Sequence, residues 1–381
     1  HMPLERGTKN YYSIIQGGLI LAKKALIAMS GGVDSSVAAF LTVNSGYECM
    51  GATMRLFDND ILPCGADSNC CSLDDTEDAR SVARKIGIPF YVFNSKSEFA
   101  EKVIASFIRS YECGCTPNPC IECNRHLKFD HFLRKARTLG CDHIVTGHYA
   151  RIRYDASSGR YLLLKAADES KDQSYVLYCL TQEQLGHTLF PLGELTKSQV
   201  RQIAQEHGFI NARKHDSQDI CFVPDGDYVA FMERYTGKHY KSGDFLDQSG
   251  SIVGHHRGAV AYTLGQRKGL GLAMGTPVYV CAKDMEKNTV TVGPNESLYA
   301  TTLRANDWNW IPFPALTAPM KVTARSRYNQ KEQPATVFPE DNGFARVVFD
   351  TPQRAMTPGQ AVVLYSGDLV VGGGTITEVI K

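Results

Sequence analysis

The alternation of short apolar runs with amphipathic segments between Lys23 and Cys221 most limits the folds open to this 381-residue chain. Lys24–Met29 is predicted to be a buried strand, Ser35–Asn44 a helix and Glu48–Leu56 the next strand. Strands that alternate with helices usually pair in parallel, with helices on both faces of the sheet. The pattern therefore predicts an α/β domain with a doubly wound parallel sheet, whose ligands bind at the carboxyl ends of the strands.

The same alternation continues through this region and then stops. The further elements expected there are the helix Asp74–Ile86, the strand Pro89–Asn94, a helix from about Lys96 to Ser110, the helix Cys123–Leu139 and the strand Asp142–Thr146. After Phe222, glycine-punctuated and period-2 patterns predict short antiparallel strands. The elements expected there are the helix Asp227–Tyr235, the hairpin of Val278–Lys283 with Thr289–Val292, and the strands Lys321–Arg327, Ala345–Asp350 and Gln360–Tyr365.

These patterns divide the chain into four segments. Residues 1–22 are an N-terminal extension that begins with His1-Met2, a dipeptide typical of an expression tag. Residues 23–224 are the α/β domain, and residues 225–298 are a small central α+β module. Residues 299–381 are β-rich and are expected to form a small antiparallel barrel or sandwich.

Charge and composition restrict the classes of function. Lys and Arg number 41 against 40 Asp and Glu, so contact with a polyanion depends on local basic patches rather than on the overall field. We expect a cytoplasmic protein with no membrane partner, because the chain shows neither a signal peptide nor the roughly 18 apolar residues of a membrane span. Its twelve cysteines then stay reduced, which favours metal binding or sulfur chemistry over disulfides.

The segment Ser30-Gly31-Gly32-Val33-Asp34-Ser35-Ser36 directly follows the first predicted strand and opens a helix. Its glycines let backbone N–H groups surround an anion, and the helix amino terminus adds partial positive charge. It lacks the Gly-Lys-Ser/Thr ending of a Walker A loop, which favours adenylation with pyrophosphate as the leaving group. Asp34 is expected to help hold Mg²⁺, and Ser35 or Ser36 to contact phosphate. The alternative is an ordinary strand-to-helix turn with a serine cap.

The loop resembles the signature of the PP-loop ATP pyrophosphatases. The resemblance implies that ATP adenylates a carbonyl or carboxylate oxygen of a second substrate and that pyrophosphate leaves. GMP, asparagine and argininosuccinate synthetases share this signature, so the loop alone does not choose the substrate. An amide-forming synthetase stays open as an alternative, and so does an RNA-binding protein that holds nucleotide only for regulation. The first requires an ammonia-supplying domain or an amino-acid pocket, and the second leaves well-placed cysteines without a role.

Cysteines in two later segments narrow the choice. Thr116–Asn124 (TPNPCIECN) enters a predicted helix, and Asp216–Phe222 (DSQDICF) lies near the end of the α/β domain. Pro119 suits the first turn of a helix, and the helix dipole stabilises the thiolate of a cysteine near that end. A sulfur nucleophile or a metal ligand is expected in such a position. The alternative is a buried structural cysteine, which is favoured for the isolated Cys49, Cys141, Cys179 and Cys281.

Together these segments resemble the MnmA family of tRNA 2-thiouridylases, in order and over nearly the whole chain from about Lys24. The resemblance implies ATP-dependent 2-thiolation of the wobble uridine in tRNAs of the Lys, Glu and Gln type, with a sulfur donor protein or inorganic sulfide as partner. It also implies that Cys123 is the nucleophile and that Cys221 carries a persulfide. The implied nucleotide site is Ala28, Met29, Ser30, Gly31, Gly32, Val33, Asp34, Ser35, Met54 and Gly147. The implied contacts with tRNA or its target base are Asn118, Pro119, Cys120, His148, Lys171, Asp172, Gln173, Arg327, Tyr328 and Gln360, the last three in the β-rich C-terminal domain.

Cys120 departs from the common pattern of this family, which has Asp at that position as a general acid or base. Cys120-x-x-Cys123 with the distant Cys221 instead resembles the iron–sulfur-dependent branch, in which three thiolates hold a [4Fe–4S] cluster and leave one iron open. We favour this cluster as a cofactor beside ATP and Mg²⁺, with cluster-free persulfide transfer as the open alternative.

A second group of cysteines lacks the paired CxxC spacing that marks a zinc site. We interpret it as part of an active-site loop, with a structural zinc site as the alternative. Its members are Cys64, Cys70, Cys71, Cys113 and Cys115.

Overall fold

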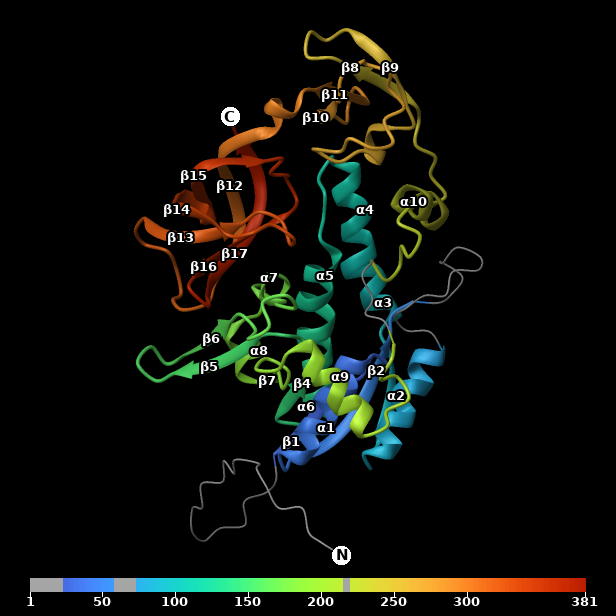
Figure 1. Cartoon of the computed structure of the whole chain (residues 1–381), viewed down its shortest axis with the longest axis vertical. Coiled ribbons are helices and arrows are strands. Elements are labelled where there is room, and N and C mark those ends of the chain that lie inside the picture. The colour runs from blue at the N-terminus through green and yellow to red at the C-terminus, as the bar shows by residue number, and fades with distance from the viewer. Residues whose placement is uncertain (1–22, 58–72, 215–219) are drawn as a thin grey trace, which may run out of the picture.

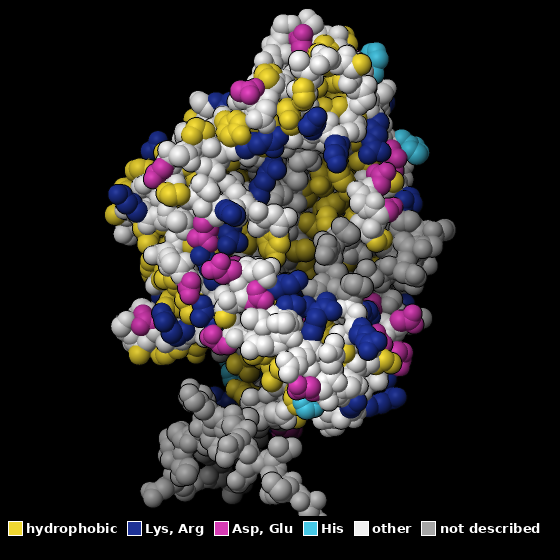
Figure 2. Space-filling model, viewed as in Figure 1, with side chains coloured by type: hydrophobic (Ala, Val, Ile, Leu, Met, Phe, Trp, Pro, Cys, Tyr) yellow, Lys and Arg dark blue, Asp and Glu magenta, His cyan; other side chains and the backbone are white. Residues whose placement is uncertain are grey.

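The computed structural model describes residues 23–57, 73–214 and 220–381. These residues form three modules around a column of helices: a parallel sheet with its helices at one end, a small β module at the other, and a barrel beside the column (Figure 1). Figure 2 shows a hollow between the modules, with apolar side chains on its floor and Lys and Arg side chains around it. Within the described residues, no helix combines the length and apolarity needed to cross a membrane.

The parallel sheet has the strand order β3-β2-β1-β4-β7, and each neighbouring pair is parallel. Its strands are β1 (Lys24–Ala28), β2 (Glu48–Arg55), β3 (Phe90–Asn94), β4 (His143–Val145) and β7 (Thr188–Leu189). The chain proceeds outward from β1 to β3 and then returns to the other side of β1 at β4. The strand order therefore reverses at β1, and ligands bind α/β sheets at the carboxyl end of such a switch point.

Successive residues of β1 enter two different cores, because neighbouring side chains of a strand point to opposite faces. Ala25 and Ile27 pack in one core and Leu26 in the other. The helices of the first core are α1 (Val33–Asn44), α2 (Leu73–Lys85) and α9 (Lys197–Glu206). Those of the second are α6 (Phe132–Thr138), α7 (Ser174–Leu177) and α8 (Gln182–Gly186). Helices on both faces confirm the predicted doubly wound α/β domain.

The helical column contains the two long helices expected from the sequence, but each changes its winding along its length. The first consists of α3 (Lys96–Phe99), the π-helical segment η2 (Ala100–Ile104) and α4 (Ala105–Glu112). The second consists of α5 (Pro119–Glu122), the π-helical segment η3 (Cys123–His131) and α6. π-Helical turns are rare and frequent at functional sites. The column's apolar side chains join residues of the sheet and of the central module in one core, which includes Leu56, Phe107, Leu127 and Phe231.

The central module is a four-stranded sheet of order β10-β11-β8-β9 with one helix beside it. Its elements are α10 (Tyr228–Thr236), β8 (Gly243–Leu246), β9 (Ile252–His256), the 3₁₀ turn η4 (Ala259–Ala261), β10 (Tyr279–Asp284) and β11 (Thr289–Gly293). The predicted hairpin is present as the antiparallel pair of β10 and β11. The helix and the strands share a core around Phe245 and Val290.

The C-terminal strands form a closed antiparallel barrel, so of the two predicted architectures the barrel is the one observed. The strand order is β12-β15-β14-β13-β16-β17, and pairing of β12 with β17 closes the circle. The strands are β12 (Tyr299–Trp310), β13 (Met320–Arg325), β14 (Gln333–Pro339), β15 (Ala345–Arg354), β16 (Ala361–Ser366) and β17 (Leu369–Ile380), with the 3₁₀ turns η5 (Asn295–Leu298) and η6 (Asp341–Gly343) before β12 and β15.

A hairpin of the α/β domain, which was not predicted, extends the barrel sheet. It consists of β5 (Arg151–Asp155) and β6 (Arg160–Leu164), and Leu164 of β6 pairs with Leu369 of β17. Tyr365 and Val363 of the barrel also lie in the second core of the α/β domain. The barrel is therefore joined to the α/β domain both by backbone pairing and by a shared core.

Candidate active site

The loop between β1 and α1 is tightly built and needs glycine at one position. Gly31 has φ +78°, and a Cβ there would collide with the backbone of Asp75. The buried Asn211 side chain holds the loop from behind, because its Nδ2 donates to the Gly31 carbonyl (2.9 Å) and to Ser36 Oγ (2.8 Å). The left-handed glycine and the amide clamp together fix the path of the backbone that faces a bound anion.

The hydroxyls of Ser35 and Ser36 form hydrogen bonds with backbone groups of the loop itself. Ser35 Oγ accepts from the Ser30 amide (3.2 Å) and donates to the Gly32 carbonyl (3.0 Å), and Ser36 Oγ donates to the same carbonyl (3.0 Å). No side chain of the described residues caps the amino end of α1. Backbone N–H groups and the helix dipole are thus the groups that this loop offers to a phosphate, which fits ATP.

Asp34 lies in the first turn of α1 and has two partners that the sequence did not predict. Lys197 Nζ lies 2.7 and 2.8 Å from its two carboxylate oxygens, and Tyr149 OH donates to Asp34 Oδ1 (2.8 Å). Gly147 passes so close that a Cβ there would lie 2.8 Å from the Asp34 carbonyl carbon and from the Ser35 nitrogen. Residues near β4 and at the start of α9 therefore enclose the loop at the carboxyl edge of the sheet.

The nucleotide residues expected from the family resemblance meet at this edge. Ala28 ends β1 and Met29 follows it, and the Thr53 hydroxyl of β2 donates to the Met29 carbonyl. Met54 follows at the end of β2 and packs against both the second core of the sheet and the core of the helical column. The structure thus brings Gly147 to the loop, although the two are far apart in the sequence, and it places Met54 near the end of the neighbouring strand β2.

The segment before the cysteines forms a well-defined helix start. Asn118 caps α5 by accepting from the Cys120 amide (3.1 Å), and Pro119 occupies the first helical position. Cys120 is exposed, whereas Cys123 is buried where the helix passes into η3. Cys123 and the half-buried Cys221 belong to the same apolar core, that of the helical column.

The fit of a [4Fe–4S] cluster depends on whether the three candidate thiols converge. Among residues 23–57, 73–214 and 220–381, no three Cys, His, Asp or Glu side chains form a group that could hold a metal. Cys120 is exposed, while Cys123 and Cys221 lie in the apolar core. The residues therefore do not fit the cluster that we favoured from the sequence, and no step is derived through it.

The second cysteine group is only partly described. Cys113 is exposed and Cys115 is half-buried, and burial raises the pKa of the Cys115 thiol. Cys64, Cys70 and Cys71 lie outside the described residues, as do Asp216 to Asp219 of the segment before Cys221. The zinc alternative therefore stays a prediction.

The barrel residues expected to contact tRNA instead hold the modules together through their polar groups. Gln360 Nε2 donates to the carbonyls of Thr116 (2.9 Å) and Pro117 (3.3 Å), just before the helix of the cysteines. Arg327 donates to the Leu264 carbonyl (3.2 Å) of the central module. Tyr328 beside it is 39% exposed and is the one of these three that presents a large open surface.

His148 lies inside the protein. Its ring contacts Phe129 and Phe190, and its Nδ1 lies 2.8 Å from Thr146 Oγ1. Burial holds the pKa of His148 well below its usual range, so the ring is neutral at physiological pH. These observations argue against a direct contact between this side chain and tRNA.

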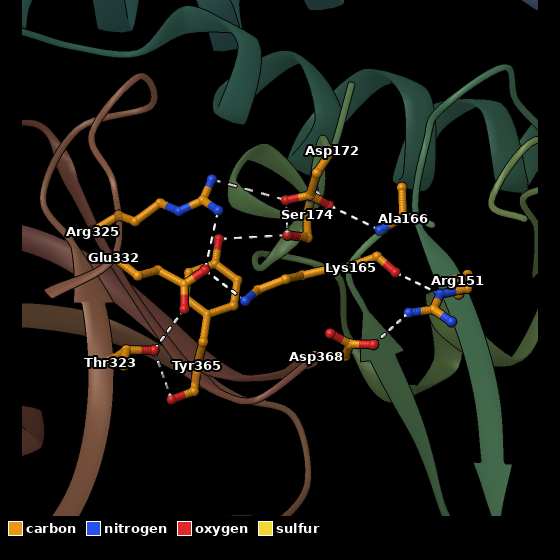
Figure 3. A network of polar contacts seen from close by, with 10 residues as sticks. All are labelled: Arg151, Lys165, Ala166, Asp172, Ser174, Thr323, Arg325, Glu332, Tyr365 and Asp368. Carbon is orange, nitrogen blue, oxygen red and sulfur yellow. Dashed lines mark hydrogen bonds and ion pairs between the residues drawn. The ribbon is translucent and has the colours of Figure 1, made fainter. Parts of the chain in front are cut away.

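Asp172 is likewise buried and is bonded within the protein (Figure 3). Its carboxylate accepts from the Ala166 amide (3.0 Å) and from Ser174 Oγ (2.8 Å), and it lies 3.9 Å from Arg325 Nη1 of the barrel. The neighbouring Gln173 accepts from the Tyr149 amide through Oε1 (2.9 Å). Lys171, Asp172 and Gln173 were predicted to contact tRNA. Asp172 and Gln173 instead make contacts inside the protein, and these contacts hold their own segment in place.

The network of Figure 3 continues into the barrel. Glu332 accepts from Lys165 Nζ (2.6 Å), Thr323 Oγ1 (2.6 Å) and Arg325 Nη2 (3.1 Å). Lys165 and Arg325 both lie over the ring of Tyr365, at 4.8 and 5.1 Å from its centroid. Charged groups from both modules thus neutralise one another across the junction that positions residues 165–174.

Asn211, Tyr149 and Lys197 are the site residues that sequence reasoning missed. A signal for Lys197 was available, because Thr196 and Gln199 form a capping box that marks the start of α9. No comparable local pattern marks Tyr149 or Asn211, since their partners in the loop lie more than a hundred residues away in the chain.

Three family models match the chain in succession. Residues 23–225 match the tRNA methyl transferase HUP domain, residues 229–294 the tRNA methyl transferase PRC-barrel domain, and residues 300–376 the Aminomethyltransferase beta-barrel domain.

Solved structures resemble the chain only weakly. An NMN synthetase from Francisella tularensis is 18% identical and covers 58% of this chain and 79% of its own, with a TM-score of 0.33. A 4-thiouridine synthetase in complex with RNA and ATP is 18% identical and covers 56% of this chain and 50% of its own, with a TM-score of 0.30. At these values the likenesses add no argument about the site.

Full-length relatives are far more similar. A tRNA-specific 2-thiouridylase MnmA of Acetivibrio thermocellus is 53% identical over 93% of this chain and 99% of its own length. Its counterpart in Clostridioides difficile is 50% identical over 94% of this chain and 99% of its own. The chain therefore belongs to the MnmA family of tRNA-specific 2-thiouridylases.

Proposed function

We propose that this chain is a cytoplasmic tRNA-uridine 2-sulfurtransferase, which activates the wobble uridine with ATP and replaces its 2-oxygen with sulfur. The observation that carries the proposal is the position of Met54. This residue is expected at the nucleotide site, and it packs against the core that contains Cys123 and Cys221. A base adenylated at the loop would therefore lie beside the two cysteines.

In the first step the uridine O2 attacks the α-phosphorus of ATP. The O2–P bond forms, the bond from the α-phosphorus to the bridging oxygen breaks, and pyrophosphate leaves with the electron pair. The backbone of residues 30–34 and the amino end of α1 bind the leaving phosphates. Asp34 would hold Mg²⁺, which supplies positive charge to the phosphate oxygens.

In the second step Cys221 carries the transferable sulfur as a persulfide. The terminal sulfur attacks C2, and AMP leaves with the former O2. The Cys123 thiolate then attacks Sγ of Cys221, which breaks the persulfide bond, leaves the sulfur on the base and forms a Cys123–Cys221 disulfide. Inorganic sulfide can reload Cys221 by attacking its Sγ in this disulfide, which forms the persulfide and releases the Cys123 thiolate. Alternatively, a dithiol reduces the disulfide, and a sulfur donor protein transfers the outer sulfur of its own persulfide to the Cys221 thiol. The apolar core around both cysteines keeps water from the adenylate.

We infer that tRNAs of the Lys, Glu and Gln type bind in the hollow of Figure 2, whose rim carries Lys and Arg side chains. Of the predicted contacts, Cys120 and Tyr328 are exposed, and Lys171 is partly exposed. Asp172, Gln173, Arg327 and Gln360 support the same surface through their internal contacts. Because the net charge is only +1, few phosphate contacts are expected, and binding should weaken modestly with salt.

The test is mass spectrometry of the nucleosides from unmodified tRNA incubated with enzyme, ATP, Mg²⁺, a sulfur donor protein loaded with a persulfide, and a dithiol. The proposal expects 2-thiouridine at the wobble position together with AMP and pyrophosphate. Cys123→Ser should abolish the product, while the matched Cys281→Ser in the central module should not. Formation of ADP and free phosphate by the wild type, or of no thiolated nucleoside, would contradict the proposal.

A further inference from the structure

The loop of residues 30–36 contains no lysine, yet a lysine from another element lies on it. Lys197, the first residue of α9, places Nζ 2.7 and 2.8 Å from the two oxygens of Asp34, and its side chain is only 11% exposed. We propose that Lys197 is a catalytic residue of the adenylation step, which moves from Asp34 to the departing pyrophosphate. The inference rests on the proposed function and adds to it the residue that compensates the leaving-group charge.

The position of Lys197 is fixed by its own helix. Thr196 caps α9 through a capping box with Gln199, and the Lys197 amide donates to Asp168 Oδ2 (2.9 Å). Val200 of the same helix packs in the core beneath α1. These contacts fix the backbone of Lys197. Its side chain can still change rotamer, and so it can move from the Asp34 carboxylate to a phosphate bound at the loop.

Charge balance explains why this lysine faces the loop. A lone carboxylate in the first turn of α1 would repel a triphosphate that approaches the same helix end. Lys197 cancels that charge in the ligand-free protein, and Tyr149 satisfies Asp34 Oδ1 as well. If Asp34 held Mg²⁺ with a bound triphosphate, the Lys197 ammonium would lose this carboxylate as a partner, and the phosphates would offer negative charge in its place.

A second lysine near the loop differs in its partners. Lys214 lies between two carboxylates, those of Asp75 and Asp78, and the Asp75 backbone supports Gly31. The two carboxylates and the single ammonium together carry a net negative charge, so this group does not attract an anionic ligand. The comparison assigns Lys214 to holding α2 against the loop and leaves Lys197 as the residue suited to phosphate.

In the reaction the α-phosphorus bond to the bridging oxygen breaks, and an electron pair moves onto pyrophosphate. The extra negative charge appears at that oxygen and its neighbours. An ammonium held at the loop stabilises this charge more in the transition state than in bound ATP, which accelerates the step. Methionine has nearly the shape of lysine without its charge, so Lys197→Met removes this effect with little change in packing.

The test measures pyrophosphate release in a single turnover with tRNA and ATP but without a sulfur source, so that adenylation alone is observed. Lys197→Met should slow the burst on the order of 100-fold, as expected for loss of one preorganised charge at a reacting centre. Lys197→Arg should retain part of the rate. Lys24→Met is the matched control, because Lys24 is also ion-paired (3.0 Å to Glu48) but lies at the opposite end of β1.

A binding measurement separates this role from a merely structural one. Isothermal titration with inorganic pyrophosphate and Mg²⁺ should show at least about tenfold weaker binding to Lys197→Met, whereas AMP should bind to both proteins equally. Thermal melting checks that the variant is folded. A wild type that releases no pyrophosphate overturns the proposed function, whereas a wild-type burst and unchanged pyrophosphate affinity in Lys197→Met overturn this inference alone.

Discussion

The nucleotide loop and the cysteine region are built in opposite ways. The loop is fixed by directional polar contacts within one domain, such as Asn211 on Gly31 and Lys197 on Asp34. The cysteines lie in an apolar core to which the sheet, the helical column and the central module all contribute. Hydrogen bonds and ion pairs depend on single atoms, whereas apolar packing tolerates changes of similar volume. Adenylation should therefore be sensitive to single polar atoms, and sulfur transfer to two thiols and to the docking of the modules.

The largest effect is expected at Asp34. Asp34→Ala should lower ATP turnover with tRNA on the order of 1000-fold, because the metal site and the anchor of Lys197 are lost together. Chromatographic measurement of AMP and pyrophosphate checks this prediction. Asp130→Ala is the control, since Asp130 is an exposed aspartate that pairs with Arg134 on the helical column. A variant at Asp34 with near wild-type turnover would show that this carboxylate is not part of the site.

The next effect separates the two steps. Cys123→Ser and Cys221→Ser should each abolish 2-thiouridine formation but leave the pyrophosphate burst intact, because neither thiol is used in adenylation. Cys120→Ser should retain much of the thiolation rate, since the exposed Cys120 lies outside the core that holds the other two. The measurement is nucleoside mass spectrometry beside the pyrophosphate assay.

Purification without oxygen tests the persulfide mechanism against the iron–sulfur cluster mechanism. If protein purified without oxygen is brown, holds about four irons per chain and loses activity in Cys120→Ser, the cluster mechanism replaces the persulfide mechanism. A colourless, iron-free and active preparation supports the persulfide mechanism.

A smaller effect is expected where the barrel supports the cysteine helix. Gln360→Ala removes the two donations to the Thr116 and Pro117 carbonyls. With a loss of about 1 kcal/mol for each of the two hydrogen bonds, thiolation should slow by up to about 30-fold while the pyrophosphate burst stays unchanged. Gln202→Ala on the exposed face of α9 is the control. An equal slowing of both steps would mean that the barrel also supports the nucleotide loop.

The smallest effect concerns pH and the junction of Figure 3. Burial acts to raise the pKa of Glu332, but hydrogen bonds from Lys165 and Thr323 and the charge of Arg325 outweigh it and hold that pKa below its usual value. A carboxyl whose pKa is lower in the folded state stabilises the fold above its unfolded pKa of about 4.3, and this stabilisation disappears as the pH falls through the folded pKa. Thermal melts of Glu332→Gln and wild type should therefore differ most at neutral pH and converge below about pH 4. A difference that does not change with pH would contradict the assignment.

The sequence predicted the parts of the fold that are set by local pattern. The strand Lys24–Met29 and the helix after the loop are present almost as predicted, because apolar periodicity and the glycines of the loop fix them locally. The hairpin of β5 and β6 was missed, although its two strands pair locally, and its attachment to β17 through Leu164 and Leu369 could not be read from any local pattern.

The site was predictable where chemistry follows a motif and unpredictable where a contact spans the fold. Gly147 lies against the loop, whereas the burial of His148 and Asp172 depends on packing that no local sequence pattern reveals. The favoured three-thiolate set is not supported by the described residues, and CxxC spacing alone does not determine how deeply each thiol is buried.

The π-helical segment that begins at Cys123 has a consequence for the evolution of this enzyme. A π-helical turn holds one residue more than an α-helical turn, so removal of one residue between Cys123 and His131 can restore ordinary winding. Both kinds of turn complete one revolution, so the helix on either side of such a deletion would face nearly the same way as before. In an ordinary α-helix, by contrast, the loss of one residue turns the flanking segment by about 100° around the axis. Natural selection should therefore tolerate a change of length in η3 better than the same change in the α-helices of the fold.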